Sequence, residues 1–244
     1  RIIQFQSSAE SEYHGASLEL VKRFSHNWTA RLGYSYGRAT DTKPDATAVV
    51  PQGTDDAKFM QDTLDAAGEH GPSDLDVRHR VVLSGVWDLK YGDSIRNSFA
   101  RFLLSGWTLS GVVTYQTGTP WSRSVNGDLN NDGNDRNDRS PGAPRNGERL
   151  PSILSVDPRI SRHFRFGPVD LELIAEAFNV FNRDNVIGIQ TNEYRLATVA
   201  GQPQLQPLAT FRTPCAGGRG CTAQAPASAG AGPRTYQLAA RLSF

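Results

Sequence analysis

The sequence predicts an all-β protein, an antiparallel transmembrane β-barrel with long extracellular loops and short periplasmic turns. Three observations carry this prediction. Seven segments alternate apolar and polar side chains, which is the period of a strand that has a different environment on each face. The connections between these segments alternate between short and long. The large aromatic residues gather near the ends of the segments, as in the two interfacial girdles of a membrane barrel.

The predicted strands follow one another along the whole chain. They are residues 13–24, 28–37, 76–89, 106–117, 156–166, 169–181 and 234–244. The short connections are 25–27, about 90–105 and 167–168, and the long ones are 37–75, 118–154 and 183–233. Three structureless connections of this length would count against a compact soluble domain, whereas outer-membrane barrels have turns at one rim and loops at the other.

The first predicted hairpin covers residues 13–37. Its strands alternate apolar side chains, among them Leu18, with polar ones, among them Glu19 and Arg31. The tripeptide Ser-His-Asn between the strands supplies a tight turn. This pattern indicates two strands that share one apolar face.

The second predicted pair of strands repeats this alternation. In the strand 76–89 the apolar side chains alternate with Arg78, Arg80 and Ser84. In the strand 106–117 they alternate with hydroxyl and amide side chains. The two tryptophans of this pair, Trp87 and Trp107, lie near the short connection, as a girdle at that rim requires.

The third predicted hairpin turns at Gly167 and Pro168. Its second strand alternates apolar residues with Glu172 and Glu176. In its first strand Arg162 interrupts the apolar face, and we expect its side chain to snorkel toward a membrane boundary.

The last predicted strand ends on an aromatic residue. Its apolar face consists of Tyr236, Leu238, Ala240, Leu242 and Phe244. An amphipathic edge strand of a soluble β-sandwich has the same pattern, so this segment alone leaves both architectures open. A sandwich would bury this face between two sheets, and a barrel would turn it outward.

Composition excludes some classes of protein. A formal net charge of +1 gives no reason to expect a nucleic-acid partner. No run approaches the roughly 18 apolar residues of a membrane helix. Membrane barrels also lack such runs, because only alternate residues of their strands face lipid, so the composition excludes helical membrane proteins and not membrane barrels. The first residue is Arg1 and no signal stretch precedes it, so we expect a processed product or part of a longer protein.

The second long connection contains a candidate calcium loop. Oxygen donors with suitable spacing are supplied by Asp128, Asn130, Asp132, Asn134 and Asp135. Gly133 occupies the sixth position, where the loop turns sharply, but the twelfth is Arg139 instead of a bidentate glutamate. This excludes an EF-hand and leaves an isolated site completed by Asp135 or Asp138. A solvated Asn/Asp/Gly turn is the alternative.

Charged residues on the polar faces are candidates for the barrel lumen. They are Glu19, Arg31, Arg78, Arg80, Glu172 and Glu176. They mark either a substrate path or a charge ladder that keeps the interior wet. Cys215 and Cys221 lie close together in a glycine-rich stretch and are suitably placed for a disulfide in an oxidising compartment.

We expect no enzymatic activity. The five histidines show no metal-ligand spacing, and no Ser-His-acid grouping stands where an outer-membrane hydrolase would need it. Distant residues can converge in a fold, which leaves a catalytic site open at this stage. No cofactor is required by this interpretation, with calcium as the possible exception.

Several segments together resemble the C-terminal barrel of TonB-dependent outer-membrane receptors. They are Y-H-G-A-S-L-E-L-V-K-R-F-S-H-N-W at 13–28, D-V-R-H-R-V-V-L-S-G-V-W at 76–87, G-W-T-L-S-G at 106–111, L-E-L-I-A-E-A-F-N-V-F-N-R-D-N at 171–185 and the terminal phenylalanine. The loop D-L-N-N-D-G-N-D-R-N-D-R-S-P-G-A-P-R-N resembles the Oar-like branch of that family.

The resemblance implies a barrel of about 22 strands closed by a plug domain, of which residues 1–244 would be the C-terminal part of the barrel domain. An odd number of strands does not close a single-chain bacterial barrel, so the N-terminal strands and the plug would be partners of this segment. Further partners implied are outer-membrane lipid, the TonB energy-transducing complex and the barrel-assembly machinery.

The resemblance also implies a location in the Gram-negative outer membrane, which the protein would reach with a signal peptide, with the C-terminus periplasmic. Tyr236, Leu238, Leu242 and Phe244 would form the assembly signal.

The function implied is energy-coupled uptake of a scarce solute of the siderophore, oligosaccharide or peptide class. One alternative is a non-transporting structural or adhesion barrel, which would lack a plug. The other is a secreted β-sandwich binding module, which would stay soluble without detergent.

Overall fold

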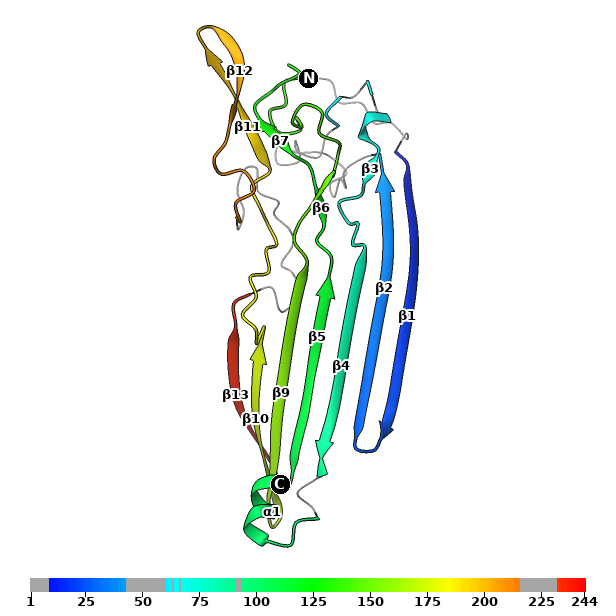
Figure 1. Ribbon diagram of the computed structural model, residues 1–244, viewed down its shortest axis with the longest axis vertical. Coiled ribbons are helices and arrows are strands. Elements are labelled where there is room, and N and C mark those ends of the chain that lie inside the picture. Colours follow the sequence, from blue (N-terminus) through cyan, green and yellow to red (C-terminus); the bar gives the residue numbers. More distant parts are fainter. Residues whose placement is uncertain (1–8, 43–59, 63, 66, 91–93, 216–231) are drawn as a thin grey trace.

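Seven long strands lie side by side in one antiparallel sheet (Figure 1). The computed structural model describes residues 9–42, 60–62, 64–65, 67–90, 94–215 and 232–244. In sheet order the strands are β1 (Ser11–Ser25), β2 (Trp28–Asp41), β4 (His79–Leu89), β5 (Trp107–Gln116), β9 (Ile153–Phe166), β10 (Val169–Phe178) and β13 (Thr235–Ser243). The predicted number, direction and sequential order of the strands are confirmed.

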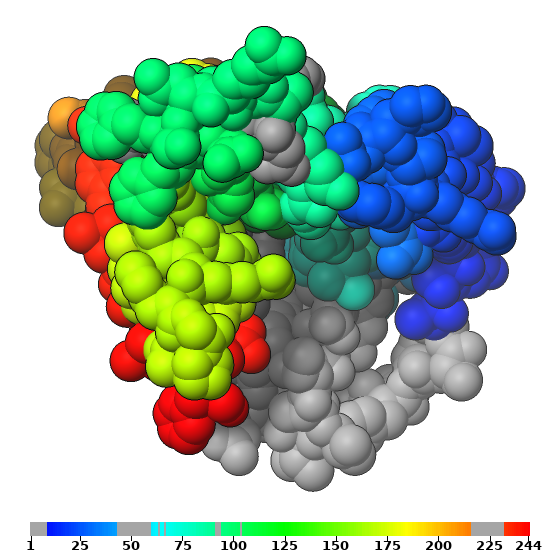
Figure 2. Space-filling model, turned by 90° about the horizontal axis from the view of Figure 1, so that it is seen from below, coloured from blue at the N-terminus to red at the C-terminus, as the bar shows by residue number. Residues whose placement is uncertain are grey.

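The sheet is open along its two edges, which are β1 and β13. Seen from below, it bends from β1 on one side to β13 on the other (Figure 2). Leu18 is 53 % exposed and Leu238 is 83 % exposed. Because a β-sandwich would bury both side chains between its sheets, the fold agrees with the barrel prediction and not with the sandwich alternative.

Strand register gives the sheet its two chemically different faces. Leu32 of β2 lies opposite Leu83 of β4, which lies opposite Val113 of β5, which lies opposite Val156 of β9. Side chains alternate between the faces along every strand, so rows of this kind keep one face apolar across the sheet. We call it the apolar face and its opposite the polar face.

Two of the three short connections are tight turns. His26 and Asn27 both have positive φ angles, 53° and 67°, as the primed two-residue turn of a hairpin requires. At the turn between β9 and β10, Gly167 has φ 63°. The third connection contains helix α1 (Ser98–Leu104), capped by the Asn97 side chain, which the sequence analysis did not predict.

Strand boundaries differ from the predicted ones by a few residues. β2 continues to Asp41 instead of ending at 37, and β10 ends at Phe178 instead of 181. β4 begins at His79 instead of 76, and β9 begins at Ile153 instead of 156. Most of these differences lie at the loop rim, where the strands leave the shared alternation.

The expectation that the long connections lack structure was wrong. They contain η2 (Ala67–Glu69), β3 (Gly71–Pro72), β6 (Pro120–Trp121), β7 (Ser124–Asn126), β8 (Glu148–Arg149), β11 (Asn192–Val199) and β12 (Gln202–Pro207). β3 extends the main sheet beside β2, and the other strands form two small sheets at the same rim. Figure 1 shows them beyond one end of the long strands, opposite α1.

Arg162, whose side chain is expected to snorkel toward a membrane boundary, packs among aromatic rings. Its side chain lies on the apolar face near α1 and is only 8 % exposed. Its guanidinium carbon is 4.5 Å from the ring centroid of Phe164, 5.0 Å from that of Phe102 and 5.1 Å from that of Trp107. Aromatic faces attract a guanidinium, so this cluster offsets part of the cost of burying the charge.

Within the described chain, none of the helices has the length and apolar character needed to span a membrane.

Candidate functional site: the polar face and the loops at its rim

The polar face carries ion pairs that join neighbouring strands. Arg31 of β2 donates to Glu19 of β1. On the other half of the sheet, Arg159 of β9 lies 3.4 Å from both Glu172 and Glu176 of β10. Glu172 and Glu176 lie four residues apart on the same face of β10, and the guanidinium of Arg159 bridges their two carboxylates. Four of the six predicted lumen candidates therefore occur in these two clusters.

A hollow of about 350 Å³ lies next to the Glu19–Arg31 pair. Arg80 lines it together with Ser17 and Ser35. It therefore presents two guanidinium groups, one carboxylate and hydroxyl groups, which suit a polar or anionic solute.

The rim assembly, by which we mean the described parts of residues 60–78, 117–152 and 179–215, lies where the long strands end. One of its junctions is centred on Asp76, whose side chain is fully buried. The carboxylate of Asp76 accepts from Arg78 Nε at 2.8 Å, from the Ala39 backbone N–H at 2.8 Å and from Arg149. Arg78, predicted as a lumen residue, thus belongs to this junction.

Burial by itself raises the pKa of Asp76, but the hydrogen bonds from Arg78, Ala39 and Arg149 outweigh burial and hold the pKa below its ordinary value of 3.8. Arg149 also donates to the carbonyl oxygens of Asp76 and Gly118, at 3.0 and 3.2 Å. The ionised carboxylate is therefore what fastens the start of β4 to the second long connection.

A second junction joins Glu69 to Arg139. The guanidinium Nη1 lies 2.9 and 2.8 Å from the two carboxylate oxygens, and the Gln61 backbone N–H donates to one of them at 3.0 Å. Glu69 is 2 % exposed. A buried carboxylate with three hydrogen bonds is well compensated, and it fixes the first long connection to the second.

Arg145 forms the third junction. It donates to the side chain of Asp41, to the Asp41 carbonyl at 2.9 Å and to the Glu69 carbonyl at 3.2 Å. A Cβ at Gly71 would lie 2.7 Å from the Arg145 carbonyl oxygen. The close approach of the two backbones therefore requires glycine at this position.

The third long connection joins the second through a small core and a strand pair. Trp121, Leu150 and Ile189 are buried against one another. β7 pairs with β11 in parallel, although their sequence positions are distant. All three long connections therefore form one structure, with charge pairs between the first two and a core between the last two.

The predicted calcium loop folds around its own carboxylates. Asp128 accepts from the backbone N–H groups of Asp132 and Gly133, at 3.1 and 2.9 Å. Asn130 accepts from Asp132 N–H at 3.1 Å, and Asp132 accepts from Asn134 N–H at 2.7 Å. Asp135 lies 3.8 Å from Arg136 and its side chain is half exposed. The five predicted residues are thus brought together in one compact turn.

The predicted disulfide involves a residue outside the described chain. Cys215 ends the described part of the third connection, where its backbone N–H donates to Gly188 at 3.0 Å. Cys221 is not among the described residues. The pairing stays a prediction, which resistance of both thiols to labelling in unreduced protein would support.

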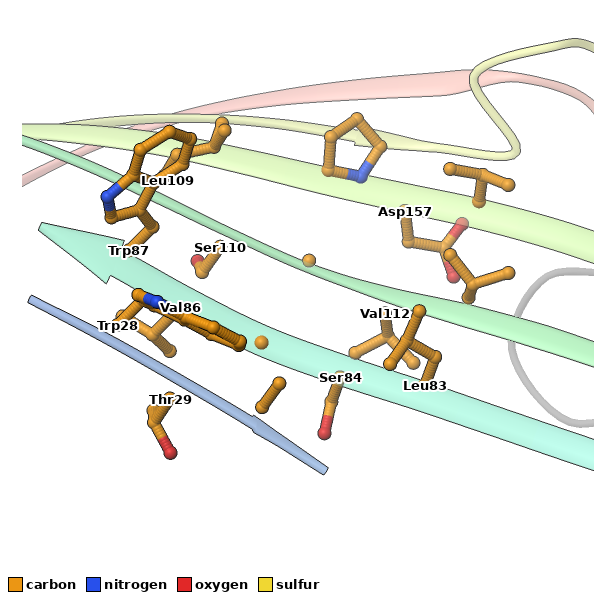
Figure 3. A pocket seen from close by; sticks show the side chains of 16 residues that line it. Trp28, Thr29, Leu83, Ser84, Val86, Trp87, Leu109, Ser110, Val112 and Asp157 are labelled. Carbon is orange, nitrogen blue, oxygen red and sulfur yellow. The ribbon is translucent and has the colours of Figure 1, made fainter. Parts of the chain in front are cut away.

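The apolar face has a hollow of about 530 Å³ (Figure 3). Trp28, Trp87 and Leu109 lie at one end of it and Leu83 at the other. The space between them follows from a cross-strand row of small or cyclic residues: Ala30, Gly85, Gly111 and Pro158. Its lining is almost entirely apolar, so it offers no group for recognising a polar solute.

The terminal strand carries the residues that are predicted to form the assembly signal. Tyr236, Leu238 and Leu242 are 65 %, 83 % and 63 % exposed on the apolar face of β13, and Phe244 follows the strand fully exposed. β13 pairs with β10 along one side. Its other side is an edge of the sheet.

Sequence reasoning missed the residues that build the rim assembly. No role was predicted for the five charged residues of its junctions, except that Arg139 was noted for excluding an EF-hand. Four of them were placed in long connections and Asp76 at the start of a strand: Glu69, Asp76, Arg139, Arg145 and Arg149. A signal was present, since the first long connection holds eight acidic residues and the second holds several arginines. Complementary charge in two loops at one rim indicates contact, but it does not identify the pairs.

Residues 1–149, more than half of the sequence, match the family described as outer membrane beta barrel domain. No curated protein and no solved structure gives a significant match.

Proposed function

The chain belongs to the family of outer membrane beta barrel domains, and we propose that it forms the last strands of a TonB-dependent receptor of the Oar-like branch. In this proposal the rim assembly is extracellular, the turns and the C-terminus are periplasmic, and the open edges of the sheet continue into further strands of the same barrel. The receptor takes up a siderophore, oligosaccharide or peptide through a plugged lumen.

One observation carries the proposal: the rim assembly lies at the end of strands that share a charged polar face. Long connections that serve only as spacers have no need of buried ion pairs such as Glu69–Arg139. A receptor needs ordered loops, because preorganised groups bind a scarce solute with less loss of conformational entropy. Below the rim, the hollow beside Arg80 and Arg31 continues the polar surface along the wall.

The test is uptake by intact cells. Accumulation of labelled siderophores, oligosaccharides and peptides would be compared in cells with the protein, without it, and without the energy-transducing partner. We expect one class of solute to require both components. Uptake that needs the barrel but persists without the partner would indicate a passive pore and would contradict the proposal.

A structural or adhesion barrel is the second candidate, since an ordered rim also suits binding to another surface. It predicts that loss of the protein leaves uptake of every solute class unchanged while envelope integrity or attachment falls. The same strains therefore distinguish the two functions.

A further inference from the structure

We propose that the loop from Asp128 to Asp138 binds one calcium ion, and that the bound ion orders the contact between this loop and residues 60–62 of the first long connection. The inference does not depend on transport, because an adhesion barrel would use the same ordered rim.

The independent observation is the state of Asp138. Its side chain is fully buried. One carboxylate oxygen accepts from the Leu129 backbone N–H at 2.8 Å, whereas the other, Oδ1, has no hydrogen-bond partner in the described chain. A buried carboxylate oxygen without a donor is unfavourable unless a cation or a proton compensates it.

The surroundings of Asp138 favour a cation. The carboxylates of Asp128 and Asp132 lie close enough to act electrostatically on the carboxylate of Asp138. Three carboxylates that act on one another in this way repel at neutral pH. A divalent cation between them replaces that repulsion with attraction, which a water molecule does not do.

The proposed donors are mixed oxygen ligands. They are the carboxylates of Asp128, Asp132 and Asp138 and the amide oxygen of Asn130. In the described residues, no three His, Cys, Asp or Glu side chains already stand as a metal-binding group. Binding therefore requires the loop to draw these oxygens together, and calcium, with its flexible geometry and six to eight oxygen ligands, is better suited to this than magnesium.

Two residues of the predicted set are not used as side-chain ligands. The side-chain oxygen of Asn134 accepts from the Arg136 backbone N–H at 3.2 Å. Asp135 points toward the guanidinium of Arg136, 3.8 Å away, with half of its side chain in solvent. Asp138 therefore completes the site in preference to Asp135.

The loop contacts the first long connection through two amides. Asn130 Nδ2 donates to the Gln61 carbonyl at 2.7 Å, and Asn137 Nδ2 donates to the Met60 carbonyl at 2.7 Å. An ion on the oxygen of Asn130 fixes its amide with the nitrogen directed at Gln61. Calcium thus stabilises the docking of residues 60–62 as well as the loop itself.

The first experiment is calorimetric titration of calcium into the detergent-solubilised, chelator-treated protein. We expect saturable binding that D138N and D132N each weaken by about tenfold or more, because each removes one charge from the ligand set. D135N is the matched control, since it removes the same charge from the same loop and should change the affinity less than about threefold. Asp132 is exposed, so D132N keeps the test valid if D138N does not fold.

Absence of calcium binding to the unmodified protein, or an equal loss of affinity in D135N, would overturn the proposal. Equal affinity for magnesium would also do so, because it would indicate general attraction to negative charge.

The second experiment is amide hydrogen exchange of residues 60–62 and 128–138 with calcium or with chelator. Calcium should slow exchange in both segments. In the presence of calcium, D138N should lose this protection. In the presence of chelator, D138N should exchange no faster than the unmodified protein, because the variant lacks the uncompensated charge of the Asp138 carboxylate. If D138N exchanges faster under both conditions, Asp138 has a structural role alone and the calcium site is contradicted.

Discussion

The barrel wall, by which we mean the seven long strands of the main sheet, and the rim assembly both contain arginine–carboxylate pairs. The pairs of the two regions differ in their exposure to solvent. In the wall, the side chains of Arg31 and Glu19 are 68 % and 49 % exposed. At the rim, those of Arg139 and Glu69 are 15 % and 2 % exposed. Exposed pairs contribute little to stability, whereas removing one partner of a buried pair leaves an uncompensated charge. The wall therefore depends on its backbone ladders, and the rim depends on individual side chains.

The largest difference is expected when one carboxylate of a pair is neutralised. Glu69→Gln leaves the Arg139 guanidinium buried without its counter-charge, and we expect the rim to lose about 3–5 kcal/mol of local stability. The measurement is hydrogen exchange of residues 67–72 and 139–150 in the folded barrel. Glu19→Gln is the matched variant in the wall and should cost at most about 1 kcal/mol. Equal effects would remove the proposed contrast between the regions.

Backbone packing allows a second comparison, between Gly71 at the rim and Gly33 in the wall. A Cβ at position 71 would lie 2.7 Å from a backbone oxygen, while at position 33 the nearest atom is 3.9 Å away. We expect Gly71→Ala to destabilise the rim by about 1–3 kcal/mol through overpacking, and Gly33→Ala to be tolerated. Protease resistance of the refolded variants measures this. If Gly71→Ala is as resistant as the unmodified protein, the close approach to Arg145 is not a constraint.

The same contrast explains how much the sequence predicted. Alternation along Val81, Leu83 and Trp87 is a local pattern with the period of a strand, so all seven wall strands and their order were predicted from it. The ends of the strands were predicted less accurately, because β2 and β9 continue at the loop rim beyond the segments in which apolar and polar side chains alternate.

The rim was not predicted because its contacts are between residues far apart in sequence. Glu69 and Arg139 are separated by 70 positions, and Arg145 and Asp41 by 104. Nothing in the residues next to Glu69 indicates that its partner is Arg139. The loop from Asp128 to Asp138 is the exception, since the residues that it brings together lie within a single short segment. The calcium site that its motif indicates stays a prediction.

A pH titration sharpens the comparison at Asp76. The folded state holds the pKa of this carboxyl below 3.8, so its ion pairs contribute fully above that value and are lost as the pH falls through the lower folded pKa. We expect the rim to open in acid before the wall, which is measured by hydrogen exchange from neutral pH to about pH 3. Asp76→Asn should weaken the rim at neutral pH and remove most of this acid dependence. An unchanged acid profile in the variant would show that other groups control the opening.

The smallest effect on stability is expected at the end of the chain. Phe244 is fully exposed beyond β13, so its deletion removes little packing and should hardly change the melting temperature of detergent-refolded protein. Its position after Tyr236, Leu238 and Leu242 on the apolar face nevertheless suits a signal read during assembly, because β13 is an edge that can pair with another strand. We therefore expect the deletion to reduce membrane insertion in cells strongly. Ser243→Ala, which changes a side chain on the polar face of the same strand and keeps the terminal aromatic, is the control and should leave insertion unchanged. If insertion and melting temperature fall together, Phe244 is a structural residue; if neither changes, the assembly role is wrong.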